Sequence, residues 1–187
     1  MVKQTNMETV KLDIGCGPNP KEGYIGCDII PFNDKIKVFH AGRDKWLFED
    51  ESVDEIHASH FLEHLTNLNE AWERTHFFNE AFRVLKKGAK MTLIFPHWAS
   101  QRYYGDPTHK EPFSEFGFYY LDKEWRAINS PHADKKYMDK GYDCDFHCTW
   151  GYNLRQDILT RNQEYQQYAM ANFKEVLTDI IATCTKK

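Results

Sequence analysis

Short stretches in which apolar and polar residues alternate mark the first half of the chain. Residues 10–14 (VKLDI) form the first stretch, and similar ones follow at 24–29, 36–40 and 52–58. Alternation with a period of two is typical of β-strands. The pattern therefore predicts four short strands before residue 60, and a fifth at 90–95, which Pro96 ends.

Between residues 68 and 85 the apolar positions recur every three or four residues instead. They are Leu68, Ala71, Trp72, Phe78, Ala81, Phe82 and Leu85. This spacing predicts an amphipathic helix over 68–85. Residues 86–88 (KKG) are expected to close it, because cations favour a helix C-terminus and glycine readily adopts the left-handed conformation beyond it. Residues 61–65 predict one helical turn.

The second half of the chain has a weaker pattern. Residues 100–150 are rich in aromatics and histidines, with short strand candidates such as 143–150. A final helix is predicted at 161–173 and a final strand at 178–184. Strands that alternate with crossovers predict an α/β fold with a parallel sheet. We expect one domain over 1–187, with an insertion or cap at about 98–150.

Composition narrows the class of protein. A length of 187 residues favours a single domain. The net charge of −4 lacks the excess of positive charge that is typical of nucleic-acid-binding proteins. The chain contains no run of about 18 apolar residues, so the sequence predicts no membrane span. The five scattered cysteines, together with an N-terminus without a signal-peptide core, predict a soluble cytoplasmic protein.

The exit of the first strand is the first candidate for ligand binding. Gly15 and Gly17 flank Cys16 there, and glycine lets backbone approach a ligand closely. Pro20 stands where a dinucleotide fingerprint has its third glycine, and there is no room for an ordinary crossover helix. A ligand without a pyrophosphate fits better than NAD or FAD. A tight turn that needs positive φ is the alternative interpretation.

Asp28 ends the second strand and is the second candidate. In an open α/β sheet, ligands bind beyond the carboxyl ends of the strands, where a carboxylate accepts hydrogen bonds from ribose hydroxyls. An aspartate at a strand end also serves as a local cap. The glycine turn and Asp28, one strand apart, favour ribose binding together more than either does alone.

Several segments carry a family resemblance: 12–19 (LDIGCGPN), 23–29 (GYIGCDI), 50–56 (DESVDEI), 59–65 (SHFLEHL) and 78–89 (FNEAFRVLKKGA). In this order they resemble the class I S-adenosylmethionine-dependent methyltransferases, in a small bacterial and phage-type subgroup with an abbreviated first crossover. The resemblance covers about the first 110 residues. It implies a Rossmann-like sheet of seven strands, mostly parallel with the last antiparallel, and S-adenosyl-L-methionine (SAM) as cofactor.

The resemblance also implies roles for single residues. Asp13, Gly15, Cys16 and Gly17 would line the methionine end of SAM. Asp28 would bind the ribose, Ile29 would face the adenine, and His60 would close the cofactor side. Residues 40–44 (HAGRD) depart from the family's acidic pair near the adenine. Either Asp44 or a backbone group is expected to bind the adenine amino group instead.

Methyl transfer is an in-line displacement that needs an aligned nucleophile and, for a protonated one, a base. His97 and His109 follow the fifth strand and are the candidate bases, with Asp106 to orient one of them. The alternative for 106–109 is a capped turn. Glu63 and His64 could equally form a structural pair.

Cys144, His147 and Cys148 lie close in sequence, but their spacing is not that of a zinc knuckle, so no metal ligand is assigned. We expect a methyltransferase for a small-molecule acceptor, without a nucleic-acid or membrane partner. A catalytically idle SAM-binding regulatory or assembly partner is the alternative. Transfer or cleavage of another part of the cofactor is a third hypothesis.

Overall fold

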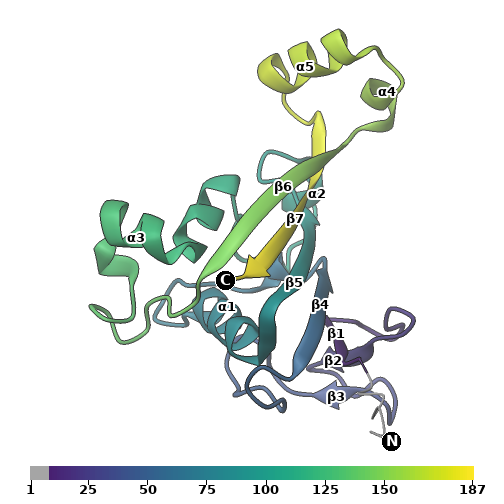
Figure 1. Cartoon of the computed structure of the whole chain (residues 1–187). Coiled ribbons are helices and arrows are strands. Elements are labelled where there is room, and N and C mark those ends of the chain that lie inside the picture. Colours follow the sequence, from purple (N-terminus) through teal and green to yellow (C-terminus); the bar gives the residue numbers. More distant parts are fainter. Residues whose placement is uncertain (1–8) are drawn as a thin grey trace, which may run out of the picture.

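A computed structural model describes residues 9–187 of the chain (Figure 1). Within these residues, seven strands form one sheet: β1 (Lys11–Ile14), β2 (Ile25–Asp28), β3 (Lys37–Val38), β4 (Val53–Ser59), β5 (Leu85–Pro96), β6 (Phe146–Leu154) and β7 (Leu177–Lys186). Their order is β3-β2-β1-β4-β5-β7-β6. The first five pair in parallel, and β7 is antiparallel to both neighbours. The predicted α/β sheet with an antiparallel last strand is confirmed.

In the described residues, the first helix follows β4. The segment from β4 to β5 holds η1 (Leu62–His64) and α1 (Glu73–Val84). Residues 97–145, between β5 and β6, hold α2 (Gln101–Tyr104), η2 (Glu115–Leu121), α3 (Lys123–Asn129), η3 (Pro131–Ala133) and loops, and are called the cap region below. The segment expected to be an insertion or cap, at about 98–150, also includes the start of β6. The short helices α4 (Gln156–Leu159) and α5 (Gln163–Asn172) join β6 to β7. β1 and β2 are connected by a loop, as the prolines predict.

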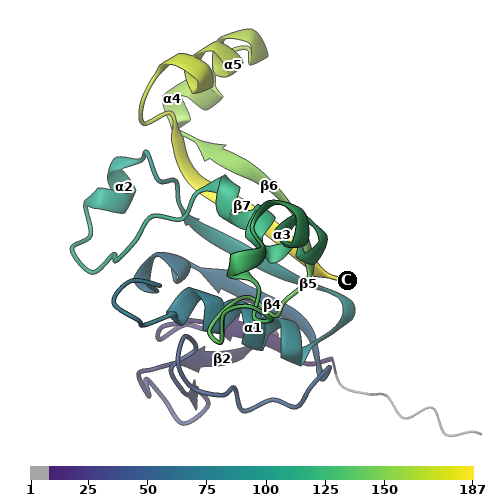
Figure 2. The same ribbon diagram turned by 90° about the vertical axis from the view of Figure 1, so that its left-hand side faces the viewer.

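The core lies on one side of the sheet. Figures 1 and 2 show α1 and α3 on the same side, with α4 and α5 beyond the far ends of β6 and β7. Alternate residues of β4 and β5, such as Ile56 and Leu93, are fully buried, whereas His57 and Thr92 between them stay partly exposed. From α1, Phe77 and Phe78 pack into this core. The period-two pattern of the sequence therefore reflects a sheet that is covered mainly on one face.

The predicted helix over 68–85 was too long at its N-terminal end. α1 begins at Glu73, because Trp72 adopts φ 52° and cannot continue a right-handed helix. Leu68 lies before the helix and is 57% exposed.

The closing role of residues 86–88 was also wrong. They belong to β5, which starts directly at Leu85, paired with Val53 of β4. The Lys86 ammonium contacts the Asp54 carboxylate of β4 at 2.6 Å instead of a helix end.

The predicted last helix and strand correspond to α5 and β7. All five cysteines are free thiols. No helix within residues 9–187 is long and apolar enough to cross a bilayer. Residues 1–8, in which the sequence shows no signal-peptide core, lie outside the described residues.

Candidate functional site

A cavity of about 490 Å³ lies at the carboxyl ends of β1, β2 and β4. Its lining consists of Ile14, Gly15, Gly17, Cys27, Asp28, Ile29, Ile30, Phe32, Phe39, His40, Ala41, His60, Phe61, His64, Leu65 and Thr108. This edge is where open α/β sheets bind ligands, and the volume suits a small molecule. Of the residues predicted to bind the cofactor, five line the cavity: Gly15, Gly17, Asp28, Ile29 and His60.

The loop after β1 forms one wall of the cavity. Gly15 has φ 68°, and its amide donates a hydrogen bond to the Cys27 carbonyl at 2.8 Å. A β-carbon on Gly15 would collide with the Phe61 ring. Gly17 also has a positive φ, of 58°, but a β-carbon there would meet open space. The two glycines thus have different roles, since Gly15 allows close packing and Gly17 keeps the wall bare.

Asp28 is held in place by backbone amides. Its Oδ2 accepts a hydrogen bond from the Gly17 amide at 2.9 Å, and its Oδ1 accepts one from the Ile30 amide at 3.0 Å. A carboxylate has about four acceptor positions, so each oxygen keeps one for a further donor. The side chain is therefore oriented to accept two adjacent hydroxyl groups from a ligand.

Exposed apolar side chains border the carboxylate. Ile29 is 58% exposed, Ile30 49% and Phe32 43%, and all three line the cavity. Neighbouring apolar groups left open to water often mark a surface that a ligand covers. Together with buried Phe39 and Leu65, they form an apolar wall that fits a planar ring.

Asp13 does not line the cavity and instead supports the glycine loop from inside the sheet. Its Oδ1 lies 2.7 Å from His57 Nδ1, and its Oδ2 accepts a hydrogen bond from the Lys21 amide at 2.8 Å. Asp13 and His57 are register partners on β1 and β4. The side chain therefore positions the end of the loop relative to the sheet.

Cys16 and Asp44 also lie outside the cavity lining. The Cys16 thiol donates to the Gly17 carbonyl, and burial, with the charges of Asp13 and Asp28, raises its pKa to about 11. The Asp44 carboxylate accepts a hydrogen bond from the His40 amide at 2.7 Å and so closes its own loop. At this place the cavity is lined by His40 and Ala41 instead.

His60 follows β4 in a left-handed conformation, with φ 53°. Its amide donates to the Ile94 carbonyl at 2.7 Å, which ties the turn to β5. Its ring nitrogen Nδ1 lies 3.4 Å from Glu63 Oε1. Interaction with the Glu63 carboxylate raises the pKa of His60 above its ordinary value, although partial burial opposes this.

His97 lies away from the cavity lining, and both of its ring nitrogens are engaged. Nδ1 accepts a hydrogen bond from the Ala99 amide at 3.1 Å, and Nε2 lies 3.1 Å from Glu115 Oε1. Burial lowers the pKa of His97 despite the neighbouring carboxylate. This arrangement leaves no nitrogen of the ring for a substrate proton.

His109 lies behind Thr108, which lines the cavity. Its Nδ1 is 2.7 Å from the Tyr103 carbonyl oxygen and so carries the proton, while Nε2 lies 3.8 Å from Asp106 Oδ2. Asp106 Oδ1 accepts from the Thr108 amide and hydroxyl, at 2.8 and 2.7 Å, and these bonds lower its pKa. Asp106 thus caps a turn and lies beside His109 at the same time.

The sequence analysis missed several lining residues, among them His40, Phe61, Leu65 and Thr108. These residues reach the cavity from loops. No periodic pattern marks them, although the aromatic ring of Phe61 directly after the His60 turn was a weak signal.

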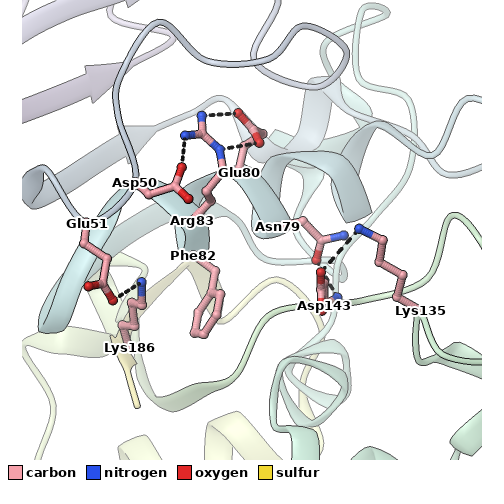
Figure 3. A pocket seen from close by; sticks show the side chains of 9 residues that line it. All are labelled: Asp50, Glu51, Asn79, Glu80, Phe82, Arg83, Lys135, Asp143 and Lys186. Carbon is pink, nitrogen blue, oxygen red and sulfur yellow. Dashed lines mark hydrogen bonds and ion pairs between the residues drawn. The ribbon is translucent and has the colours of Figure 1, made fainter.

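A larger cavity of about 620 Å³ lies at the opposite ends of the strands, where β4 begins (Figure 3). Its charged side chains pair with one another. Arg83 contacts Asp50 and Glu80, each at 2.7 Å, while Lys186 pairs with Glu51 and Lys135 with Asp143, both at 3.3 Å. Since these charges satisfy one another, we place the candidate ligand site at the carboxyl edge.

Residues 28–93 match a family described as "Methyltransferase domain". The fold is similar to a SAM-dependent methyltransferase from Archaeoglobus fulgidus, with a TM-score of 0.65 and 18% identity over 95% of this chain and 86% of that chain. A SAM-dependent methyltransferase from Methanosarcina mazei gives a TM-score of 0.55 and 19% identity over 96% and 93%. The YcgJ protein of Bacillus subtilis gives 0.54 and 14% over 96% and 92%. No curated protein matches.

The described chain has the fold of the class I SAM-dependent methyltransferases, and residues 28–93 are similar to the methyltransferase-domain family. SAM is the methyl donor of that family. The predicted fold, enzyme class and cofactor are therefore confirmed.

Proposed function

We propose that the cavity at the ends of β1, β2 and β4 binds SAM and that the chain transfers its methyl group to a small-molecule acceptor. The observation that carries this proposal is the Asp28 carboxylate, which two amides hold with one acceptor position free on each oxygen. A ribose diol fits that arrangement. The bare wall at Gly17 suits the methionine portion, and the apolar side chains of Ile29, Ile30 and Phe32 suit the adenine.

When bound, SAM supplies a methyl group on a positively charged sulfur. The work left to the protein is to align an acceptor with that methyl group and to exclude water. We infer that the acceptor enters beside His60, His64 and Thr108, which are polar residues of the cavity lining. The cavity volume of about 490 Å³ suits a small-molecule acceptor. An acidic chain without a basic footprint disfavours nucleic acid as the acceptor.

A protonated acceptor also needs a group that takes up its proton. Of the two predicted bases, His97 has both nitrogens engaged. Nε2 of His109 is the nitrogen that remains for a proton or a metal ion.

Calorimetric titration with SAM and with S-adenosylhomocysteine tests the binding proposal. We expect saturable binding by the wild-type protein. We expect Asp28→Ala to weaken it at least about tenfold, or about 1.4 kcal/mol, because the ribose acceptor is lost. Asp143→Ala removes an equal charge on the exposed surface and should bind like the wild type.

Circular dichroism and thermal unfolding verify that both variants fold. Wild-type affinity in a folded Asp28→Ala protein would contradict the assignment of Asp28. Binding without methyl transfer to any of a panel of small acceptors would favour a regulatory SAM-binding protein instead.

A further inference from the structure

Glu63, His64 and His109 form a cluster beside the cavity. A ligand atom from each lies within 4.8 Å of those of the other two. Glu63 and His64 belong to η1, and His109 belongs to the cap region, whose Lys110 amide donates to the Glu63 carbonyl at 2.9 Å. The cluster thus joins two segments that are about 45 residues apart in the sequence.

The Glu63 carboxylate is the unusual member. Its side chain is 2% exposed, and neither oxygen has a hydrogen-bond donor in good geometry. Burying a carboxylate without a partner is costly, so such groups are paired or bind metals. The groups nearest to Oε1 are His60 Nδ1 at 3.4 Å and His109 Nε2 at 3.9 Å. A positive charge between Glu63 and His109 would satisfy this carboxylate.

The two histidines of the cluster are oriented as metal ligands commonly are. A ligating histidine usually donates its other N–H to a carbonyl or carboxylate, which leaves the ligating nitrogen unprotonated. His109 Nδ1 does so to the Tyr103 carbonyl at 2.7 Å, and His64 Nδ1 lies 3.4 Å from the Thr108 carbonyl. The Nε2 nitrogens are therefore left for a metal ion.

We propose that Glu63, His64 and His109 bind a divalent transition-metal ion, with Zn²⁺ the best fit. Two imidazoles and one carboxylate suit such an ion, whereas Ca²⁺ and Mg²⁺ prefer oxygen ligands alone. Ligands of a tetrahedral Zn²⁺ with bonds of about 2.1 Å lie about 3.4 Å apart, so the side chains must move inward slightly. The site differs from the Cys144, His147 and Cys148 group, whose Cys148 thiol contacts Cys184 at 2.9 Å.

Three protein ligands leave a coordination position for water or another oxygen ligand. Because His64 also lines the cavity, that position adjoins the space assigned to the acceptor. Binding of an acceptor oxygen there would rest on the proposed methyl transfer. Metal binding itself does not depend on it.

The test uses the full chain after removal of metal with a chelator. Zn²⁺ is titrated calorimetrically, and Co²⁺ is followed by its visible absorption, which reports the ligand geometry. We expect one ion per chain in the wild type. In His109→Gln and Glu63→Gln the affinity should fall at least about tenfold. His147→Gln is the matched control, because this histidine is exposed on β6 outside the cluster.

Failure of the wild type to bind either ion would overturn the proposal, as would equal weakening in His147→Gln and His109→Gln. Thermal unfolding shows whether the variants fold, and His64→Gln, at a half-buried position, replaces any variant that does not. S-adenosylhomocysteine binding, measured on the same samples, separates this proposal from the methyltransferase proposal. A cluster variant that loses metal binding but keeps S-adenosylhomocysteine binding supports the metal proposal and leaves the methyltransferase proposal intact.

Discussion

At the scale of single residues, the cavity depends on backbone conformations that only glycine adopts at low cost. Gly15, Gly17 and Gly23 all have positive φ, but their surroundings differ. A side chain on Gly15 would meet Phe61, whereas Gly17 and Gly23 have no neighbour within 4 Å of the β-carbon position. Gly17 lines the cavity and Gly23 does not. Substitutions of Gly17 and Gly23 therefore distinguish the effect of backbone strain from the effect of a side chain that obstructs a ligand.

We predict that Gly17→Ala and Gly23→Ala each lower the free energy of unfolding by about 1–2 kcal/mol, the cost of a left-handed conformation for alanine. Only Gly17→Ala should also weaken S-adenosylhomocysteine binding, because it adds a methyl group to the lining of the cavity. Denaturant unfolding and calorimetric titration measure the two effects. Equal affinities in the two variants would show that the ligand does not approach Gly17.

At the scale of elements, the start of α1 is tied to three loops by one buried carboxylate. Glu73 is the first helical residue, and its side chain is fully buried. Oε1 accepts hydrogen bonds from Arg43, and Oε2 accepts them from the Lys110 ammonium and the Thr66 amide, each at 3.1 Å. Burial alone would raise the pKa of Glu73, but these donors outweigh it and lower the pKa.

Because the folded-state pKa lies below the ordinary value of 4.5, ionised Glu73 stabilises the protein above that value. This stabilisation is lost as the pH falls through the folded-state pKa. We predict that Glu73→Gln lowers the free energy of unfolding by about 2 kcal/mol or more at pH 7. The difference from the wild type should shrink in acid. Glu70→Gln, exposed just before the helix, is the control, and a pH-independent difference would contradict the electrostatic explanation.

At the scale of the whole molecule, the buried apolar side chains within residues 9–187 form two separate clusters. The main core lies between the sheet, α1 and the cap region, whereas Ile158, Ala169 and Val176 form a small cluster at the α4–α5 end. Figure 1 shows this end projecting beyond β6 and β7. A cluster without contacts to the main core has its own low stability, so it should open without global unfolding.

We predict that Ile158→Ala speeds hydrogen exchange of the amides in α4 and α5 and leaves those of β4 and β5 unchanged. The side chain is 4% exposed, so its truncation leaves a cavity in a cluster with few other contacts. Ile128→Ala, at an 81% exposed position, is the matched control. Faster exchange throughout the sheet would show that the two clusters unfold together.

The accuracy of the sequence analysis followed the range of the interactions involved. The strands, the end of α1 within a residue, and the placement of Gly15, Gly17 and Asp28 around one cavity were predictable, because they depend on neighbours in sequence and on a shared sheet edge. The start of α1 was misplaced, since the left-handed turn at Trp72 has no signal in the apolar spacing. Asp13 and Asp44 were expected among the cofactor ligands. Their carboxylates instead hold the Lys21 and His40 amides, contacts that the sequence pattern does not reveal.

By itself the sequence determined the succession of strands and crossovers along the chain and the family resemblance. It also determined that a ligand would bind at the carboxyl ends of the strands. Only the tertiary structure decided which loop residues reach that edge. It placed Thr108 on the cavity and His109 against Glu63, and it engaged both nitrogens of His97 with other groups. The reason is physical: local patterns record which side of a strand or helix is buried, whereas contacts between distant loops depend on the path of the chain in space.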